Sequence, residues 1–174
     1  MKKKRLIYLL MGILLLLMTG CGKGTSSNHA SVSDSQVKIY YTNATGTKML
    51  YQTKQRSKET NKQLAAEQML VWMKEEPESE NYFVAIPSEV VINNVVARNN
   101  IVNIDFAVGY GNLDKAKDVI CRAAIVKTLI QIDGIDYVEF SIGGKTMMDA
   151  DGTPIGSLTD SSFLFTTLPM EEKK

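Results

Sequence analysis

The sequence has very few of the side chains on which most hydrolases and zinc sites depend. Its 174 residues include one histidine, His29, and two cysteines, Cys21 and Cys121. A nucleophilic triad needs a base, normally histidine, beside a serine or cysteine, and structural zinc needs several cysteine or histidine ligands. Two cysteines are also too few for a disulfide framework. These shortages exclude triad hydrolases, zinc modules and disulfide-stapled folds.

Nucleotide-binding and hydrolase motifs are also missing. The sequence contains neither a G-x-S-x-G nucleophile elbow nor a P-loop. Gly109 and Gly111 open like a dinucleotide-binding fingerprint, but Asp114 holds the place of the third glycine. We therefore predict no catalytic residue, no cofactor and no metal site, and we interpret the protein as a non-enzyme.

Carboxylates are the remaining candidates for chemistry. Asp105, Asp149 and Asp151 could meet in space and form a carboxylate-only site. For Asp105, at the end of a predicted strand, we favour a structural role as an acceptor for nearby backbone amides. The segment from Asp149 to Gly152 resembles the start of a calcium loop, but it lacks the glutamate at the twelfth position, so a turn is expected there.

The charge balance gives the chain no general attraction to nucleic acid. The formal net charge is +1, but four of the cations lie at the N-terminus, in the segment MKKKR. Without them, 16 basic side chains stand against 19 acidic ones, a net charge of −3. Nucleic-acid binding depends on phosphate neutralisation by clustered basic residues, so we predict no nucleic-acid partner.

The N-terminus has the pattern of a secretory signal. The basic start is followed by an apolar run of 13 residues from Leu6 to Met18, which is short for a spanning helix but suits a signal peptide. Met18-Thr19-Gly20-Cys21 resembles a bacterial lipobox, with methionine in place of the usual leucine. That resemblance implies a signal peptide over residues 1–20 and acylation of Cys21. An uncleaved anchor and a plain signal peptide are the alternatives.

Residues 21–36 are interpreted as a lipid-anchored tether. They are rich in glycine, serine, asparagine and threonine, with almost nothing to bury, and fifteen such residues span about 20 Å as a random coil. His29 lies in this tether and is expected to be solvated. Two or more acyl chains would make a stable anchor. We therefore expect a globular domain over residues 37–168 at the extracytoplasmic face of the bacterial membrane, and a solvated tail over residues 169–174.

The globular part is predicted to be organised around a hairpin from Val90 to Phe106. Val102, Ile104 and Phe106 alternate with polar residues, which is typical of a strand with one buried face. Asn99 and Asn100 are expected to form the turn, because asparagine tolerates left-handed conformations. A hairpin alone is marginally stable in water, so something must pack on its apolar face.

Two amphipathic segments are predicted to cover the hairpin. The first helix runs from about Asn61 to Lys74, after a capping-box pair of Thr60 and Gln63. Its buried stripe is expected to consist of Leu64, Ala65, Gln68, Met69 and Trp72, widened by Val71.

The second helix is predicted from about Asp114, a suitable N-cap, to Ile132. Cys121 falls in this helix and is interpreted as a small buried thiol. The expected stripe consists of Ala116, Val119, Ile120, Ala123, Val126 and Ile130, with a second edge at Ile125, Leu129 and Ile132. Such a helix is apolar enough to be covered on both flanks.

Further strands are predicted from short β-branched and aromatic runs. They are Val37–Thr42, Lys48–Thr53, Tyr82–Ile86 and Tyr137–Ile142, with a late strand at Thr153–Ile155 or Phe163–Leu168. Strands and helices mixed around an antiparallel hairpin indicate an α+β fold, a small mostly antiparallel sheet with two helices packed on one face.

The order of these pieces resembles the GerMN domain of sporulation and germination proteins. A stop at Glu76-Pro77 departs from the family in having glutamate where glycine is usual. The other matching pieces are the helix Gln63–Lys74, the segment Tyr82–Pro87, the triplet Ile104–Phe106, Thr128-Leu129, Phe140, Ile142, Gly144-Lys145 and Gly152–Ile155.

The resemblance implies a non-enzymatic surface lipoprotein with a fold similar to ring-building modules of secretion-type assemblies. Its partners would be membrane lipid, through acylated Cys21, and proteins of the envelope or the spore assembly, with a homo-oligomer as an open alternative. It would act as a protein-interaction module in sporulation, spore germination or envelope assembly. A lipoprotein that binds a small ligand at the cell surface is the alternative function.

Overall fold

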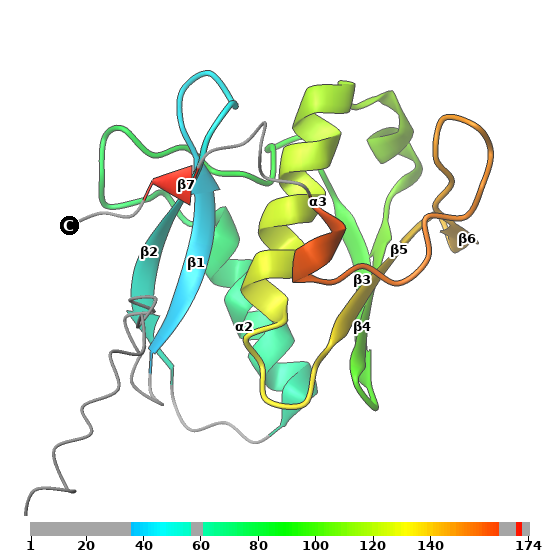
Figure 1. Cartoon of the computed structure of the whole chain (residues 1–174), viewed down its shortest axis with the longest axis horizontal. Helices are drawn as coiled ribbons and strands as arrows, with labels where there is room; N and C mark the ends of the chain where they lie inside the picture. The colour runs from blue at the N-terminus through cyan, green and yellow to red at the C-terminus, as the bar shows by residue number, and fades with distance from the viewer. Residues whose placement is uncertain (1–35, 57–60, 164–169, 172–174) are drawn as a thin grey trace, which may run out of the picture. The chain divides into compact units, whose positions relative to one another are not determined.

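Residues 36–56, 61–163 and 170–171 are described by the computed structural model (Figure 1). The strands are β1 (Gln36–Thr42), β2 (Met49–Gln55), β3 (Ile92–Arg98), β4 (Ile101–Phe106), β5 (Tyr137–Ile142), β6 (Lys145–Thr146) and β7 (Met170–Glu171). The helices are α2 (Lys62–Lys74) and α3 (Lys115–Leu129), with short 3-10 helices η2 (Val108–Asn112) and η3 (Asp160–Ser162). Strand β1 begins at Gln36, the last residue that we assigned to the tether.

The strands form two sheets, not the single sheet that we expected. One has the order β1-β2-β7 and the other β3-β4-β5-β6. The pairs β1–β2, β3–β4 and β5–β6 are antiparallel, whereas β2–β7 and β4–β5 are parallel. The α+β class is confirmed. Side chains, and not another strand, bond to the outer edge of β1. Gln131, just after α3, accepts from the Lys38 amide, and Thr128 of α3 accepts from the Tyr40 amide, so β1 ends its sheet on this side.

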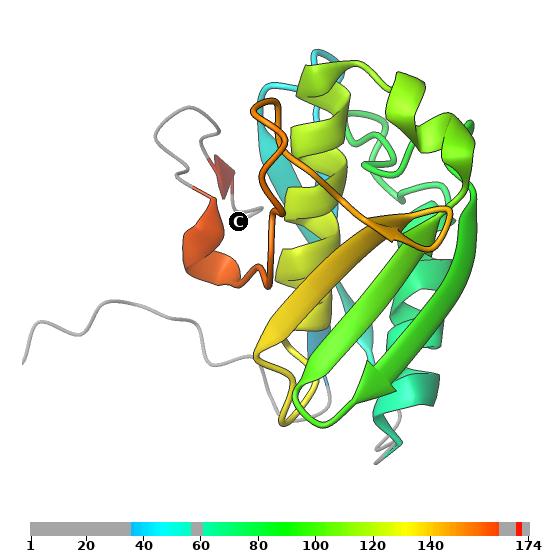
Figure 2. The ribbon, with the colours of Figure 1, turned by 90° about the vertical axis from the view of Figure 1, so that its right-hand side faces the viewer.

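The helices fill the space between the two sheets. Both contact β1, while α2 also contacts β3 and α3 also contacts β5. In Figure 2 the β3-β4-β5 sheet lies in front of the helices and β1 lies behind them. Each sheet therefore has a helix-covered face, and the core occupies the two interfaces.

The predicted hairpin is confirmed as the centre of the larger sheet. Val102, Ile104 and Phe106 are each 0% exposed, and Asn99 has a φ of 56° at the turn. The Phe106 ring stacks on Tyr110 with centroids 3.9 Å apart and on Phe140 at 5.6 Å. These aromatic contacts join β4, β5 and η2 into one packed unit.

Helix α2 presents a different face to the core from the one that we predicted. Leu64 and Val71 are 50% and 55% exposed, and Gln68 is exposed as well, so the assignment of these three residues to the buried stripe is wrong. The buried residues are Ala65, Ala66, Met69, Leu70 and Met73. The small side chains of Ala65 and Ala66 let the helix approach its neighbours closely, which explains why this side of the helix is buried. The N-cap is Asn61, whose side chain accepts hydrogen bonds from the backbone amides of Gln63 and Leu64.

Helix α3 and the shorter segments match the predictions in part. Asp114 is the N-cap as predicted, but the helix ends at Leu129 and not at Ile132. Ala116 and Val119 are exposed, so their assignment to the buried stripe is wrong. Residues 82–86 form no strand, only a bridge between Phe83 and Thr42. The late segment at Pro154 makes a single bridge with Met148, and residues 164–168 lie outside the described part of the chain.

A lysine at the start of α2 joins two turns that are far apart in the sequence. Lys62 Nζ donates to the carbonyl oxygens of Asn99, at 2.6 Å, and Gly134, at 2.8 Å. Gly134 has a φ of +74°, and a Cβ added there would lie 2.8 Å from Lys62 Nζ. The ammonium group thus fixes the β3–β4 turn against the α3–β5 loop.

We expect Lys62→Met to lower the free energy of unfolding by about 1–2 kcal/mol, because two carbonyl acceptors lose a charged donor. Urea denaturation measures this change. Lys145→Met, at an exposed lysine of β6, is the control and should leave the midpoint unchanged. Equal stability of the two variants would contradict a role for Lys62 in joining the turns.

Candidate functional site

Asp105 is a structural acceptor, as predicted. Its carboxylate accepts hydrogen bonds from the Ser141 hydroxyl at 2.6 Å, the Gly144 amide at 2.7 Å and the Asn93 side chain at 3.1 Å. The hydrogen bond from Ser141 is the largest cause that lowers the pKa of Asp105 below its ordinary value, followed by those from Gly144 and Asn93. The carboxylate thus joins β3, β4 and the β5–β6 turn.

Asp149 organises a turn of its own. Its carboxylate accepts hydrogen bonds from the backbone amides of Asp151, at 2.9 Å, and Thr153, at 2.8 Å. Asp105 and Asp149 therefore hold different loops and share no hydrogen-bond partner. Within residues 36–56, 61–163 and 170–171, no three His, Cys, Asp or Glu side chains cluster closely enough to hold a metal ion.

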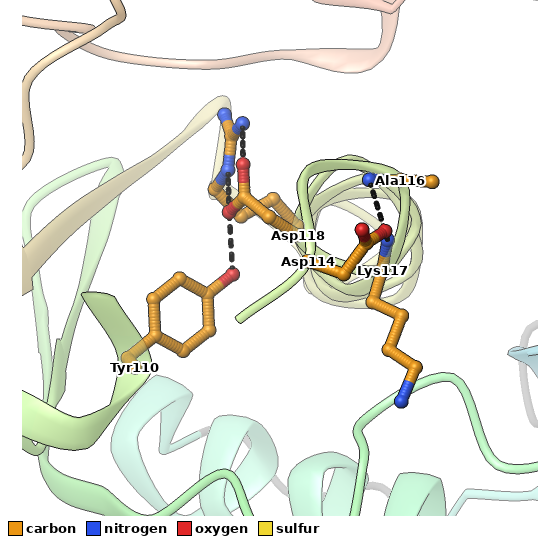
Figure 3. Close-up of polar contacts among 6 residues, drawn as sticks. Tyr110, Asp114, Ala116, Lys117 and Asp118 are labelled. Carbon is orange, nitrogen blue, oxygen red and sulfur yellow. Dashed lines mark hydrogen bonds and ion pairs between the residues drawn. The ribbon is translucent and has the colours of Figure 1, made fainter. Parts of the chain in front are cut away.

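A polar network lies where η2 meets the first half of α3 (Figure 3). The Tyr110 hydroxyl donates to Asp118 Oδ1 at 2.8 Å. Arg122, one turn further along α3, donates to both oxygens of the same carboxylate, through Nε at 2.8 Å and Nη2 at 2.6 Å. This two-bond geometry fixes the guanidinium plane, so the side chains of the network are held in one arrangement.

Burial sets the protonation behaviour of this network. It raises the pKa of Tyr110 far above its usual range, and Cys121 and Asp118 raise it further. Burial also raises the pKa of the Cys121 thiol to about 12. For Arg122, burial lowers the pKa, but the hydrogen bond and the charge of Asp118 outweigh that effect and raise it. Neither the phenol nor the thiol is therefore prepared to act as a base or nucleophile at neutral pH.

A hollow of about 620 Å³ adjoins the network, and we call it the α3 hollow. Its apolar walls include Val119, Met147, Met148, Pro154, Ile155 and Phe163. Its polar side consists of Lys115, Asp118 and Arg122, which share one face of α3 with Val119. The hollow thus combines an apolar wall with a helix face that carries two basic side chains and one acidic side chain.

The outward side of α2 carries a second, smaller groove of about 390 Å³, the α2 groove. Leu64 and Val71, which are half exposed, flank it together with Gln68 and the partly buried Trp72. Lys54 Nζ lies 5.7 Å from the centre of the Trp72 ring and forms an ion pair with Glu75. A row of aliphatic side chains on an outer helix face is typical of a protein-contact surface.

Glutamine side chains close two sheet edges. Gln63 of α2 donates to the Val95 carbonyl oxygen at 2.8 Å and accepts from the Ala97 amide at 2.7 Å, on the outer edge of β3. Gln131 does the same at β1, where it bonds both the amide and the carbonyl oxygen of Lys38, at 2.8 and 2.7 Å. These backbone groups are therefore not free to pair with a strand from another protein.

The third edge, that of β5, is closed by backbone. β6 pairs with Ser141 and Ile142, and Val138 exchanges two backbone hydrogen bonds of 2.8 Å with Leu158. On the other sheet, β2 pairs with β7 at Met49 and Leu50. Binding by strand addition is thus restricted on three edges of the sheets that the structure describes.

Sequence reasoning missed most of these surfaces. The spacing of Asp118 and Arg122 by four residues on a helix was a readable signal for their ion pair, but nothing in the sequence placed Tyr110 beside them. Gln63, interpreted as part of a capping box, bonds to β3 instead. Cys121 is buried as predicted, whereas Cys21 lies outside the described residues. Among the helices that the structure describes, none is both long and apolar enough to cross a membrane.

Comparison with known proteins identifies the family. A family model named Germane and described as sporulation and spore germination matches residues 38–147. The chain belongs to the Germane family. The resemblance to GerMN domains that we drew from the sequence is thereby confirmed. A search of curated proteins found no match.

Solved structures with the Germane fold agree with this assignment. The first GerMN domain of the sporulation protein GerM from Bacillus subtilis aligns with a TM-score of 0.57 and 21% identity, covering 72% of this chain and 98% of that chain. The tandem GerMN domains of the same protein align with a TM-score of 0.56 and 22% identity, covering 71% of this chain but only 45% of that chain. This chain thus spans less than half of the tandem structure, and the likeness shows a shared fold.

The Asp105 contacts of this Germane domain predict a dependence of stability on pH. Because the folded-state pKa lies below the ordinary value of 3.8, the stabilisation is complete above that value and is lost as the pH falls through the folded-state pKa. We expect Asp105→Asn to remove this part of the acid-induced fall in the urea midpoint. Asp151→Asn, at an exposed turn residue, is the control. Identical acid profiles for wild type and Asp105→Asn would contradict the assigned role.

The burial of Cys121 predicts an unreactive thiol. In a Cys21→Ser background, where Cys121 is the remaining cysteine, maleimide labelling at pH 7.5 should be about a hundredfold or more slower for folded than for urea-unfolded protein. The Cys121 side chain is 0% exposed, which keeps the reagent away, and burial raises the pKa of its thiol to about 12, which keeps the fraction of reactive thiolate low. Rapid labelling of the folded protein, measured by mass spectrometry, would show that the α3 interface opens easily.

Proposed function

We propose that this Germane domain is a membrane-tethered, non-enzymatic protein-interaction module that acts in sporulation, spore germination or envelope assembly. The family description supports the biological setting. The N-terminal signal pattern and the lipobox-like Met18–Cys21 support acylation of Cys21 and a place on the extracytoplasmic face of the cell membrane. The tether of residues 21–36 would then let the domain reach partners near that surface.

The α2 groove is the observation that carries the proposal of a protein contact. Leu64 and Val71 lie two helical turns apart on one side of α2, and both keep half of their surface exposed. A partner helix with aliphatic side chains at matching spacing would cover both, as in other helix-groove complexes. Burial of two such side chains contributes about 1.5–3 kcal/mol each at most. A second copy of this chain is the alternative occupant.

The partly buried Tyr110–Asp118–Arg122 network supports a non-enzymatic role. Both carboxylate oxygens of Asp118 are occupied by Tyr110 and Arg122, so no carboxylate oxygen in the network is left to act as a base. The high pKa of Cys121 keeps its thiol protonated. The network therefore functions best as a rigid support for α3 and η2.

The anchored module is tested by complementing a deletion strain. We expect the wild-type gene to restore the yield of heat-resistant, germinating spores, and Cys21→Ser and Val71→Glu to fail. Val91→Glu is the matched control, because Val91 is also 55% exposed but lies outside α2. Immunoblots verify that each variant accumulates. Normal sporulation and germination of the deletion strain would contradict a role in those two processes. Equal rescue by Val71→Glu and Val91→Glu would contradict the assignment of the contact to the α2 groove.

Size-exclusion chromatography with light scattering separates the two occupants of the α2 groove. If the partner is a different protein, wild type and Val71→Glu should have the same mass. A wild-type dimer that Val71→Glu dissociates would assign the groove to self-association.

A further inference from the structure

We propose that the α3 hollow is a second binding site, separate from the α2 groove, for a partner polypeptide that carries a large apolar side chain beside a carboxylate. The hollow has a volume of about 620 Å³, within the range of about 300–1,000 Å³ typical of ligand sites. Its two kinds of wall determine the chemistry of the occupant.

The apolar wall comes from the segment after β6. Met147 and Met148, Pro154 and Ile155 face α3 across the hollow. Met147 is 5% exposed and Met148 is 53% exposed, so the wall runs from the core to the surface. Methionine side chains adapt to partners of different shape and are common on peptide-binding surfaces. This wall fits a phenyl ring or a branched aliphatic chain.

The helix wall has an excess of positive charge at Lys115. Asp118 forms an ion pair with Arg122 and accepts a hydrogen bond from Tyr110, and Asp149, which also lines the hollow, accepts hydrogen bonds from two backbone amides. Lys115 is exposed and forms no ion pair within the described part of the chain. The Arg122 guanidinium uses Nε and Nη2 for Asp118, which leaves Nη1 outside that pair. A carboxylate beside Lys115 would complement the one charge of this wall that has no ion-pair partner among the described residues.

The open shape of the hollow favours a polypeptide over a free small molecule. Its rim carries two large exposed side chains, Val119 at 40% and Met148 at 53%. Small-ligand sites usually enclose about 70–90% of the ligand surface, which an open hollow does not do. A side chain that projects from a partner protein needs only one such hollow, because the partner's own surface covers the rim.

Methyl NMR on the full chain in detergent micelles tests the site directly. With [13C]methyl-methionine, Met147 and Met148 report on the α3 hollow, Met69 reports on the α2 groove and Met73 reports on the core. The probe is an acetylated, amidated pentapeptide with phenylalanine followed by aspartate among glycines. We expect it to shift the Met147 and Met148 signals in a saturable manner and to leave Met69 and Met73 unchanged.

Two lysines on α3 provide a matched pair of variants. Lys115→Glu should weaken the peptide at least about fivefold, because an attraction becomes a repulsion. Lys117→Glu makes the same change of charge at a lysine that points away from Asp118 and Tyr110 (Figure 3). Lys117 pairs with Glu89 at 3.5 Å, outside the hollow, so this variant should have little effect on the peptide. Peptides with alanine for phenylalanine, or asparagine for aspartate, should each bind at least about fivefold more weakly.

Several results would overturn the proposal. One is the absence of Met147 and Met148 shifts at millimolar peptide; another is equal weakening by Lys115→Glu and Lys117→Glu. A shift of the Met69 signal, with the Met147 and Met148 signals unchanged, would show that the peptide binds in the α2 groove. Phenylacetate binding as tightly as the peptide would assign the α3 hollow to small carboxylates. Unchanged Met73 signals in both lysine variants verify that the fold is intact.

Discussion

The backbone groups at the sheet edges set the strongest constraint on this fold. A strand edge that lies against a helix layer is partly shielded from water, so its amide and carbonyl groups need partners within the protein. Gln63 and Gln131 provide them, at Val95, Ala97 and Lys38. Each glutamine offers one donor and one acceptor and so stands in for a neighbouring strand. Two separate sheets can therefore share one helix layer without merging into a single sheet.

This constraint also determines which surfaces remain for binding. The edges of β1, β3 and β5 are occupied, which restricts strand addition. The exposed sides of the helices are the surfaces that remain available. Helix α2 offers an aliphatic surface around Leu64 and Val71, and α3 offers a mixed surface around Lys115 and Val119. The two surfaces differ in chemistry, so a single domain could hold two different partners in an assembly.

The local patterns predicted most of the elements but not their assembly. The alternation of Val102, Ile104 and Phe106 and the N-cap at Asp114 are short-range signals, and both were predicted correctly. The inward face of α2 was not predicted correctly, because Leu64 and Val71, which are exposed, are as apolar as the residues that are buried. The choice depends on how closely Ala65 and Ala66 allow neighbouring elements to approach, which is a tertiary effect. The Tyr110–Asp118 contact and the α3 hollow also depend on chain segments that meet only in the folded state.

Amide hydrogen exchange at Lys38 and Ala97 tests the edge closure most directly. If glutamine side chains bond these amides as the structure shows, both should exchange slowly, at rates close to those of amides paired within the sheets, such as Ile104. The Gln131→Ala and Gln63→Ala variants should accelerate exchange selectively at Lys38 and Ala97, respectively. Fast exchange of both amides in the wild-type protein would show that the edges are open to solvent, and strand addition would then replace the helix faces as the expected mode of binding.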